Sequence, residues 1–459
     1  MRSSCSVRLS IVAALCAVVL SGCSDFLTGT GLTTDPNHPT SATARTLFVA
    51  SEANVFAVQE GPLARAVCTW MQQCAGVNNQ AIAIGTYDLT ESDFSWAAVY
   101  GGGGLIDLHR VEDDRLAAGD STFAGIAMVL EEFLVGTAAD LWGDVPYSQA
   151  AGESATPSLD AQQTVYESIQ TRLSTAIDLL GKTSITNIGP TDADFVYHGD
   201  VTKWRALAYT LKARYYLHTA EKVGATAYQS ALAAADSGIS TSANDYTSSH
   251  SGTSLAESNL WYQYTHTWPT LLGAGKYMAD LLQTTGDPRL MQDYIPVPAN
   301  PGAGIAHDSV VGASPGQTLA PGGTVSRLAR YNAATAAQPL VTWAENQLII
   351  AEASYNLSNE PTAIGRLNDV RADAGLSGVS LTGAPLLEAI MTEKYIREFE
   401  NIEALSDYRR TCLPALVPAP GKSQLPARLL YPQADRNTNP NIPAPSEQPA
   451  RNWNDPNGC

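Results

Sequence analysis

Residues 212–238 read KARYYLHTAEKVGATAYQSALAAADSG, and this stretch carries the clearest indication of the fold. Apolar and small residues recur at helical spacing up to Gly224, and a second helical segment of small residues then runs to Gly238. Residues 349–375, IIAEASYNLSNEPTAIGRLNDVRADAG, repeat this arrangement of a small-residue helix, a short turn and a second helix. Two such pairs predict an all-α fold in which helix pairs stack and bury their apolar stripes.

Helical patterns extend from these two pairs along the rest of the chain. Helices are expected at residues 122–141, 160–180, 202–223, 226–237, 269–285, 340–357, 361–374 and 385–410. The paired segments are loose variants of the tetratricopeptide unit, although the strict period of that repeat is missing. We therefore predict a tetratricopeptide-like helical-repeat scaffold with long irregular loops that are free to carry recognition.

Loop-rich sequence separates the helices in the second half of the chain. Residues 241–268 are polar and aromatic, and residues 295–339 hold many Pro, Gly and Ala but few charged residues. A loop of that length inside a globular domain is usually functional or disordered. We expect one domain over residues 46–459, with a loop-rich insertion at about 241–339 and an extended proline-rich end.

The first residues have the composition of a bacterial lipoprotein signal. Two arginines precede a short apolar run at residues 9–20, which is too short to span a bilayer stably. LSGC at residues 20–23 is similar to the bacterial lipobox, in which the cysteine sulfur is diacylated and the chain is cut just before it. We expect removal of residues 1–22, lipid (palmitate among its acyl chains) on Cys23, and a flexible tether over residues 23–45.

The residue after Cys23 and the overall charge indicate where the protein acts. Ser24, which is not an Asp, favours the cell outer membrane by analogy with known sorting rules. The chain has 27 Lys and Arg against 45 Asp and Glu, a formal net charge of −18. Such a chain repels nucleic-acid phosphate, and no basic stretch compensates, so a nucleic-acid partner is not expected. No later segment indicates a transmembrane helix.

Four cysteines remain besides Cys23 and those of the signal: Cys68, Cys74, Cys412 and Cys459. An even number in an oxidising compartment allows disulfides, with more than one possible pairing. We favour Cys68–Cys74 because it is local, and Cys412–Cys459 because it would fasten a loose tail. Metal binding by Cys68 and Cys74 is less favoured, since no histidine or second cysteine pair lies nearby.

Short motifs are spread along nearly the whole chain after Cys23. In order they are LTTDPN at residues 32–37, DFSW at 93–96, DLWGDVPY at 140–147, and Lys203-Trp204 followed by LKARY at 211–215. Later come DPR at residues 287–289, Glu352-Ala353, LNDVR at 367–371 and YRR at 408–410. Each motif alone is weak, and the specificity of the set lies in its order.

This ordered set resembles the SusD/RagB family of outer-membrane nutrient-binding lipoproteins. The resemblance implies a surface-exposed helical-repeat protein that sits over a SusC-like, TonB-dependent barrel. It also implies that the protein captures oligosaccharides, or in some members peptides, and acts as a lid that delivers them to the barrel. The family offers no catalytic residues to transfer, so a binding protein without a cofactor, and not an enzyme, is expected.

Aromatic side chains are the candidates for ligand binding, because flat apolar rings pack against the C–H faces of sugars. The densest group is WYQYTHTW at residues 261–268, where the helical pattern lapses. We expect Trp261, Tyr262, Tyr264 and Trp268 to form a curved, partly exposed platform. The alternative is that these rings attach the loop to the core.

A second aromatic group contains Trp70, Tyr87, Trp96 and Tyr100. Trp96 and Tyr100 are four residues apart on an expected helix, which favours a position in the core. Trp70 and Tyr87 stay candidates for ligand binding, and the site would be sought near them if the loop at residues 261–268 were structural.

Acidic and histidine residues show no pattern typical of catalysis or metal binding. Glu131 and Glu132 are adjacent, so on a helix they point in different directions, and a solvated face is expected for them. Glu393, Glu398 and Glu400 are expected to form ordinary ion pairs on a polar helix face. The histidines lack a metal spacing such as H-E-x-x-H, so no metal site is expected.

Two further classes of function remain open beside a glycan-binding lipoprotein. A glycoside hydrolase would need a placed carboxylate pair and would turn over its glycan. A helical-repeat interaction scaffold would bind a protein partner but no small ligand. We favour glycan binding because it accounts for the lipobox, the ordered motifs and the aromatic residues together.

Overall fold

A computed structural model describes residues 42–152, 154–299, 308–318, 324–456 and 458–459. The lipobox, Cys23 and most of the expected tether lie outside the described residues. Residues 47–459 form one compact unit. All described strands, and all described helices after α3 (Ala44–Glu60), belong to it.

Helices dominate the described chain, which confirms the all-α prediction. The long helices after α3 are α4 (Pro62–Trp70), α7 (Leu105–Ala117), α8 (Ser121–Trp142), α9 (Gln162–Leu180), α10 (Val201–His218), α12 (Ala225–Ala235), α13 (Leu260–Thr267), α14 (Lys276–Thr285), α16 (Trp343–Asn356), α17 (Glu360–Asp373), α18 (Ala384–Arg397) and α19 (Glu403–Thr411). Shorter ones are α5 (Gln80–Thr86), α6 (Ala97–Tyr100), α11 (Ala220–Val223), α15 (Leu290–Asp293) and α20 (Gln433–Arg436).

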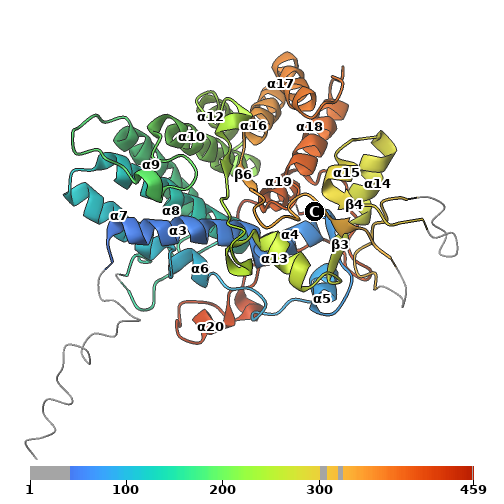
Figure 1. The fold of residues 1–459 in the computed structure, drawn as a ribbon, viewed down its shortest axis with the longest axis horizontal. Coiled ribbons are helices and arrows are strands. Elements are labelled where there is room, and N and C mark those ends of the chain that lie inside the picture. The colour runs from blue at the N-terminus through green and yellow to red at the C-terminus, as the bar shows by residue number, and fades with distance from the viewer. Residues whose placement is uncertain (1–41, 153, 300–307, 319–323, 457) are drawn as a thin grey trace, which may run out of the picture. The chain divides into compact units, whose positions relative to one another are not determined.

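Helices α7, α8, α9, α10, α12, α16, α17 and α18 form a continuous stack (Figure 1). Helix α8 packs between α7 and α9, α10 packs on α9 and α12, and α16 packs on α12, α17 and α18. The stretch at residues 212–238 spans α10 to α12, and the stretch at 349–375 spans α16 and α17. The predicted tetratricopeptide-like helix pairs are therefore confirmed, and they are neighbours through α12 and α16.

Helix caps and small side chains explain why these pairs form. The Asp200 carboxylate accepts hydrogen bonds from the N–H groups of Thr202 and Lys203 at the start of α10. Thr342 and Glu345 form a capping box at the start of α16. Alanines then let the helices approach closely in a core made of Ala213, Leu217, Ala231, Ala234, Ala235, Ile349 and Ile350.

Helix α8 lies at the centre of the first half of the stack. Among the described helices it alone has the length and hydropathy of a membrane span, yet its apolar window is completely buried inside the protein. At Gly136 an added Cβ would come within 2.1 Å of the Tyr215 hydroxyl of α10, so glycine is required for this contact. Helix α8 is therefore a core helix of the scaffold.

Two expected features of the helix pattern are corrected. The helix expected at residues 385–410 is divided into α18 and α19, because Glu400 between them has a φ of 63°. Residues 261–267, where the pattern was expected to lapse, lie in α13. The Asn259 carboxamide oxygen caps α13 by accepting hydrogen bonds from the N–H groups of Trp261 and Tyr262.

Short antiparallel sheets organise residues 241–341. Strand β1 (Cys74–Gly76) pairs with β3 (Leu272–Ala274), β2 (Tyr246–Thr247) with β6 (Pro339–Val341), and β4 (Tyr294–Ile295) with β5 (Arg327–Leu328). The first pair places Cys74 opposite Ala274 and joins the segment after α13 to the segment after α4. These pairings attach the irregular loops to the helical scaffold.

Two disulfides form, and they are the pairing that the sequence favours. Cys68–Cys74 links the end of α4 to β1, and Cys412–Cys459 joins the end of α19 to the last residue of the chain. The tail between Cys412 and Cys459 is largely without regular structure, as expected. It is also held by hydrogen bonds, among them that from the Asn452 amide to the Asp140 carbonyl.

Candidate functional site

Helix α13 directs its aromatic side chains to different sides. Trp261 is 2% exposed and lies in the core. Tyr262 stacks on His266, with ring centroids 5.2 Å apart and planes inclined by 18°. Tyr264 and Trp268 are four residues apart, so they lie on the same side, nearly opposite to Tyr262. The expected single platform of four rings is therefore reduced to Tyr264 and Trp268.

Tyr264 and Trp268 line a shallow hollow between α13 and α4. Its volume is about 230 Å³, and its remaining walls are formed by Arg65, Leu260, Gln263 and Thr267. The Trp268 side chain is 53% exposed, which is unusual for so large an apolar ring. The Arg65 guanidinium carbon lies 4.3 Å from the centroid of the Tyr264 ring, within the range of a cation–π contact.

A second hollow adjoins the first, and Leu260 lines both. It has a volume of about 470 Å³, within the range of small-molecule sites. Apolar walls come from Ala53, Phe56, Ala57, Phe195 and Ala256, and polar groups from Ser249, His250, Ser251, Glu257 and Ser258. Both hollows thus adjoin the start of α13, and together they combine apolar surfaces with hydroxyl and imidazole groups.

Glu60 at the end of α3 fixes the start of α13. Its carboxylate is fully buried and accepts hydrogen bonds from the Leu260 N–H and the Asn259 amide, at 3.2 and 3.3 Å. The His250 Nε2 atom lies 2.9 Å from the other oxygen of Glu60. Because these contacts are buried, α13 and both hollows are held on a rigid support.

The same His250 atom also lies 3.0 Å from the Ser248 hydroxyl. A Ser-His-Glu triad requires the acid and the serine on different ring nitrogens, with the serine free to attack a ligand. Here Glu60 and Ser248 share Nε2, and the Ser248 oxygen also accepts the Gln338 N–H. The arrangement is therefore a structural hydrogen-bond cluster and lacks the geometry of a nucleophilic site.

Trp70 and Tyr87 lie outside the lining of both hollows. Trp70 is fully buried, and its indole N–H donates to the Ile84 carbonyl at 3.1 Å, which fastens α5 to α4. Tyr87 ends α5 with a φ of 62° and is partly buried, and this burial raises its pKa to about 12. Trp70 therefore supports the helices near Arg65 from the core and offers no free ring face.

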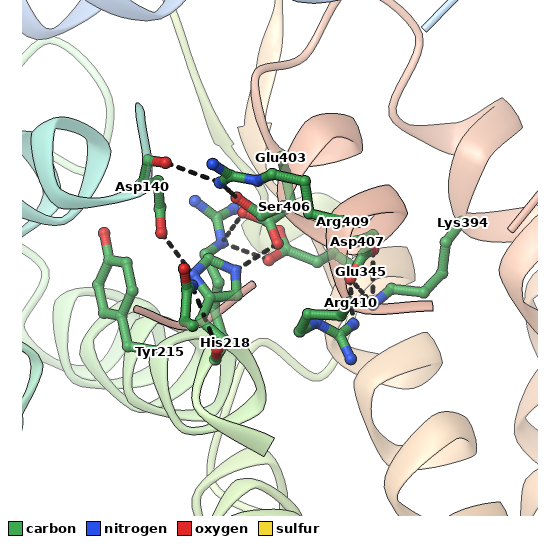
Figure 2. A network of polar contacts seen from close by, with 12 residues as sticks. Asp140, Tyr215, His218, Glu345, Lys394, Glu403, Ser406, Asp407, Arg409 and Arg410 are labelled. Atoms are coloured by element: carbon green, nitrogen blue, oxygen red, sulfur yellow. Dashed lines mark hydrogen bonds and ion pairs between the residues drawn. The ribbon is translucent and has the colours of Figure 1, made fainter. Parts of the chain in front are cut away.

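A buried polar network connects five helices at the centre of the scaffold (Figure 2). His218 of α10 lies between Asp140 of α8 and Glu403 of α19, with Nδ1 2.8 Å from Asp140 and Nε2 2.6 Å from Glu403. The Arg214 guanidinium pairs with Glu345 of α16. Burial alone lowers the pKa of His218, but the two carboxylates outweigh it and raise the pKa to about 9.

The network continues from α19 into α16 and α18. Lys394 Nζ lies 3.0 Å from Glu352 and 2.7 Å from Asp407, and Arg410 pairs with both of these carboxylates. All four side chains are almost completely buried. Burial opposes ionisation, yet Lys394 and Arg410 hold the pKa of the Asp407 carboxyl below its usual range, so the group stays ionised and paired.

Asp140, His218 and Glu403 place three potential metal-ligand atoms within 4.8 Å of one another, a cluster that sequence spacing does not reveal. Both ring nitrogens of His218 already point at carboxylates, so the protonated imidazole occupies the place of a cation. Tyr166 also donates to Asp140 at 2.5 Å. The donor set therefore suits a closed ion pair better than an open metal or catalytic centre.

Glu131 and Glu132 are buried, which corrects the solvated face expected for them. With Glu112 they surround the Arg172 guanidinium, whose nitrogens lie 2.6 to 3.1 Å from the three carboxylates. Burial and the nearby charge of Glu131 raise the pKa of Glu132 to about 8. Arg172 occupies the space between the carboxylates, so they stabilise the packing of α7, α8 and α9 and do not flank an open cleft.

Glu393, Glu398 and Glu400 are also buried, in contrast to the expected polar helix face. Glu393 receives two hydrogen bonds from Arg289 of the DPR motif, at 2.6 and 3.1 Å. Arg289 is in turn held by Asp287 at 2.7 Å. Glu393 therefore connects α18 to the segment before α15 instead of decorating the surface.

Sequence reasoning did not identify Arg65 as a site residue. Arg65 is the only charged residue in α4, PLARAVCTW, and a single basic residue in an otherwise apolar helix is a weak signal. Its contact with Tyr264 depends on the packing of α4 against α13, which neither segment encodes alone. The site that the geometry supports consists of Arg65, Tyr264, Thr267 and Trp268 with the adjoining second hollow.

Comparisons with known proteins agree with this architecture. A SusD-like family model, described as starch-binding and associating with the outer membrane, matches residues 36–357. No curated protein matches the chain. A SusD/RagB family protein from Bacteroides thetaiotaomicron has 22% identity and a TM-score of 0.74, and the match covers 91% of this chain and 100% of that one.

Two further structures with the same fold carry the words chitin-binding in their names. One is a chitin-binding protein with 21% identity and a TM-score of 0.74, for which the match covers 90% of this chain and 100% of that one. The other is a chitin-binding SusD homolog from Flavobacterium johnsoniae, with 19% identity and a TM-score of 0.72. That match covers 90% of this chain and 97% of the other.

Proposed function

Because this chain belongs to the SusD-like family of starch-binding proteins that associate with the outer membrane, we propose that it captures glycans at the cell surface. The bound oligosaccharide passes to a SusC-like, TonB-dependent transporter, for which the protein serves as a lid. Glycan binding is supported by the family description and by the chitin-binding proteins that share the fold. The transporter and the lid follow from the family resemblance of the ordered motifs.

The exposure of the Trp268 ring is the observation that carries the proposal. More than half of its surface is exposed at the edge of a hollow, although burying such a ring inside the protein would be favourable. Aromatic rings with one free face are the usual platforms for sugars, whose C–H groups pack against them. Tyr264 lines the same hollow as Trp268, and the Arg65 guanidinium packs against the Tyr264 ring.

An oligosaccharide, and not a single sugar, fits the surroundings of α13. The hollow at Trp268 is small, at about 230 Å³, whereas the second hollow measures about 470 Å³. Leu260 lines both, so a chain of several sugar units can follow the surface from one hollow to the other. Hydroxyl groups of Thr267, Ser249 and Ser251 are suited to hydrogen bonds with sugar hydroxyls.

The anchor and the location belong to the same proposal. Lipid on Cys23 attaches the protein to the outer membrane, and the segment at residues 23–45 lets the helical part reach the transporter. The protein binds its ligand without cutting it. This is supported by the carboxylates of the two ion-pair clusters, which are buried and engaged with Arg172, His218, Lys394 and Arg410.

Measuring glycan binding to the Trp268→Ala variant by calorimetry tests the proposal. Maltoheptaose and chitohexaose serve as probes, because the family and its neighbours are described as binding starch and chitin. Loss of the ring should weaken binding by roughly 10-fold or more, while Trp268→Phe, which keeps a ring, should retain most of it.

Ile185→Ala is a matched control, since Ile185 is a fully exposed apolar residue that lines neither hollow. It should bind glycan like the unmodified protein. The site assignment is overturned if Trp268→Ala binds as tightly as the control.

A further inference from the structure

Arg65 differs from the arginines of this acidic protein that pair with carboxylates. Arg172, Arg214, Arg289, Arg330 and Arg410 each contact at least one carboxylate. Within the described part of the chain, the Arg65 guanidinium forms no hydrogen bond or ion pair, and its contact is the ring of Tyr264. None of the other five residues that line the hollow is charged.

This guanidinium is partly dehydrated while it remains a cation. Burial lowers the pKa of Arg65 to about 10, and Tyr264 opposes the shift, so the group is protonated at neutral pH. Removing a charge from water without a partner is costly, and an anion that entered the hollow would remove this cost. An uncompensated cation at the edge of a binding hollow therefore favours an anionic ligand group.

The geometry of the contact determines which kind of anion fits. The guanidinium carbon lies 4.3 Å from the Tyr264 ring centroid, and an aromatic ring takes up none of the N–H donors in ordinary hydrogen bonds, so these groups stay available. These donors form a planar fork that matches the two oxygens of a carboxylate. The exposed ring of Trp268 and the hydroxyl of Thr267 line the same hollow, where they can contact the sugar that bears the carboxylate.

We propose that the Tyr264–Trp268 hollow selects glycans that contain uronic acid, with Arg65 binding the sugar carboxylate and Trp268 stacking on its ring. This inference rests on the proposed function and specifies its substrate class. The net charge of −18 does not prevent such binding, since charges are screened beyond about 8 Å at physiological ionic strength. At contact distance the ligand meets Arg65 and no acidic residue among those that line the hollow.

The experiment compares ligands that differ only in charge. Hexagalacturonate and its fully methyl-esterified form are titrated into the full-length protein, together with alginate and hyaluronan oligosaccharides as further acidic probes. Maltoheptaose and chitohexaose are the neutral probes. At least one acidic probe should bind. If hexagalacturonate is that probe, the free acid should bind roughly 10- to 100-fold more tightly than its ester, because one charge-assisted contact contributes about that factor.

Variants then assign the effect to Arg65. Arg65→Gln should weaken binding of the acidic probe by a similar factor and weaken binding of any neutral probe much less, whereas Arg65→Lys should retain part of the affinity for the acidic probe. Arg110→Gln is the matched control, because Arg110 is 68% exposed on α7 and its loss changes the net charge equally. Thermal melting verifies that each variant is folded, and the comparison of acid and ester in the unmodified protein needs no variant.

The outcomes separate this inference from the proposed function. Trp268-dependent binding of neutral probes alone, with none of the acidic probes bound, overturns the uronic acid specificity and leaves glycan capture intact. Acidic probes that bind equally well to Arg65→Gln and to Arg110→Gln also overturn it. If neither acidic nor neutral glycans bind, both proposals fail together.

Discussion

The Nε2 atom of His218 lies 2.6 Å from a carboxylate oxygen of Glu403, a residue 185 positions later in the chain. This contact joins the end of α10 to the start of α19, and the Nδ1 atom of the same ring reaches Asp140 of α8 (Figure 2). One imidazolium thus connects the repeat helices to the segment that precedes the C-terminal tail. Its protonation is therefore part of the stability of the scaffold.

We predict that the free energy of unfolding decreases as the pH rises from about 6.5 to above 9. The pKa of His218 is about 9 in the folded protein, above the value of roughly 6.5 for an unfolded histidine. The ion pairs are fully present below the unfolded pKa and are lost as the pH rises through the folded pKa, a change on the order of 3 kcal/mol. Urea unfolding at a series of pH values measures it.

The matched control for this pH effect is His198→Asn. His198 is exposed and has a φ of 53°, which Asn tolerates, so the variant should keep the pH profile. His218→Gln should be less stable at pH 6, and its stability should depend less on pH. An unchanged slope in His218→Gln would show that other groups cause the effect.

Variants of Trp261 and Trp268 test the assignment of Trp261 to the core and of Trp268 to the binding surface. Trp261→Ala should lower the free energy of unfolding by about 3–5 kcal/mol, because this ring is 2% exposed. Trp268→Ala should change it by less than about 1 kcal/mol, since more than half of the ring faces solvent. Denaturant titration of both variants measures the difference, and equal losses would contradict the assignment.

Removing the Cys412–Cys459 disulfide should destabilise the protein more than removing Cys68–Cys74. The loops they close span 47 and 6 residues, for which chain entropy estimates about 4 and about 2 kcal/mol. Double Cys→Ala variants, compared by denaturant titration, give the order. Limited proteolysis should in addition cut the tail only in the Cys412→Ala/Cys459→Ala variant.

Cys23→Ser should release the protein from the membrane fraction, because serine lacks the sulfur that carries the lipid. Fractionation of cells that express the variant measures this, with Cys68→Ala/Cys74→Ala as a control that keeps the anchor. A Cys23→Ser protein that stays firmly in the outer membrane would rule out lipidation at this position.

Purified protein should leave the length of a bound glycan unchanged. The carboxylates of Glu131 and Glu132 in one cluster, and of Glu403 in another, are buried and paired with cations, so they cannot flank a glycosidic bond. Mass spectrometry of maltoheptaose and hexagalacturonate after prolonged incubation measures this. Shorter products that increase with protein concentration would establish a hydrolase instead.

The sequence by itself determined the helix pairs and the family. Apolar periodicity is a local property, so residues 212–238 and 349–375 could be assigned to α10–α12 and α16–α17 without knowledge of their partners. The order of short motifs indicated the SusD-like fold, and the spacing of four cysteines favoured the two disulfides that form. Each of these inferences depends on neighbours in the chain.

Tertiary structure decided which polar and aromatic residues are buried and which are free. Whether Glu132 is solvated depends on Arg172 from another helix. The burial of Trp261 depends on how α13, whose start is capped by Asn259, packs against the rest of the protein. The site pairs Arg65 with Tyr264 across α4 and α13, which are distant in sequence. Contacts between distant segments carry no local pattern, because they arise only when the helices pack and exclude water between them.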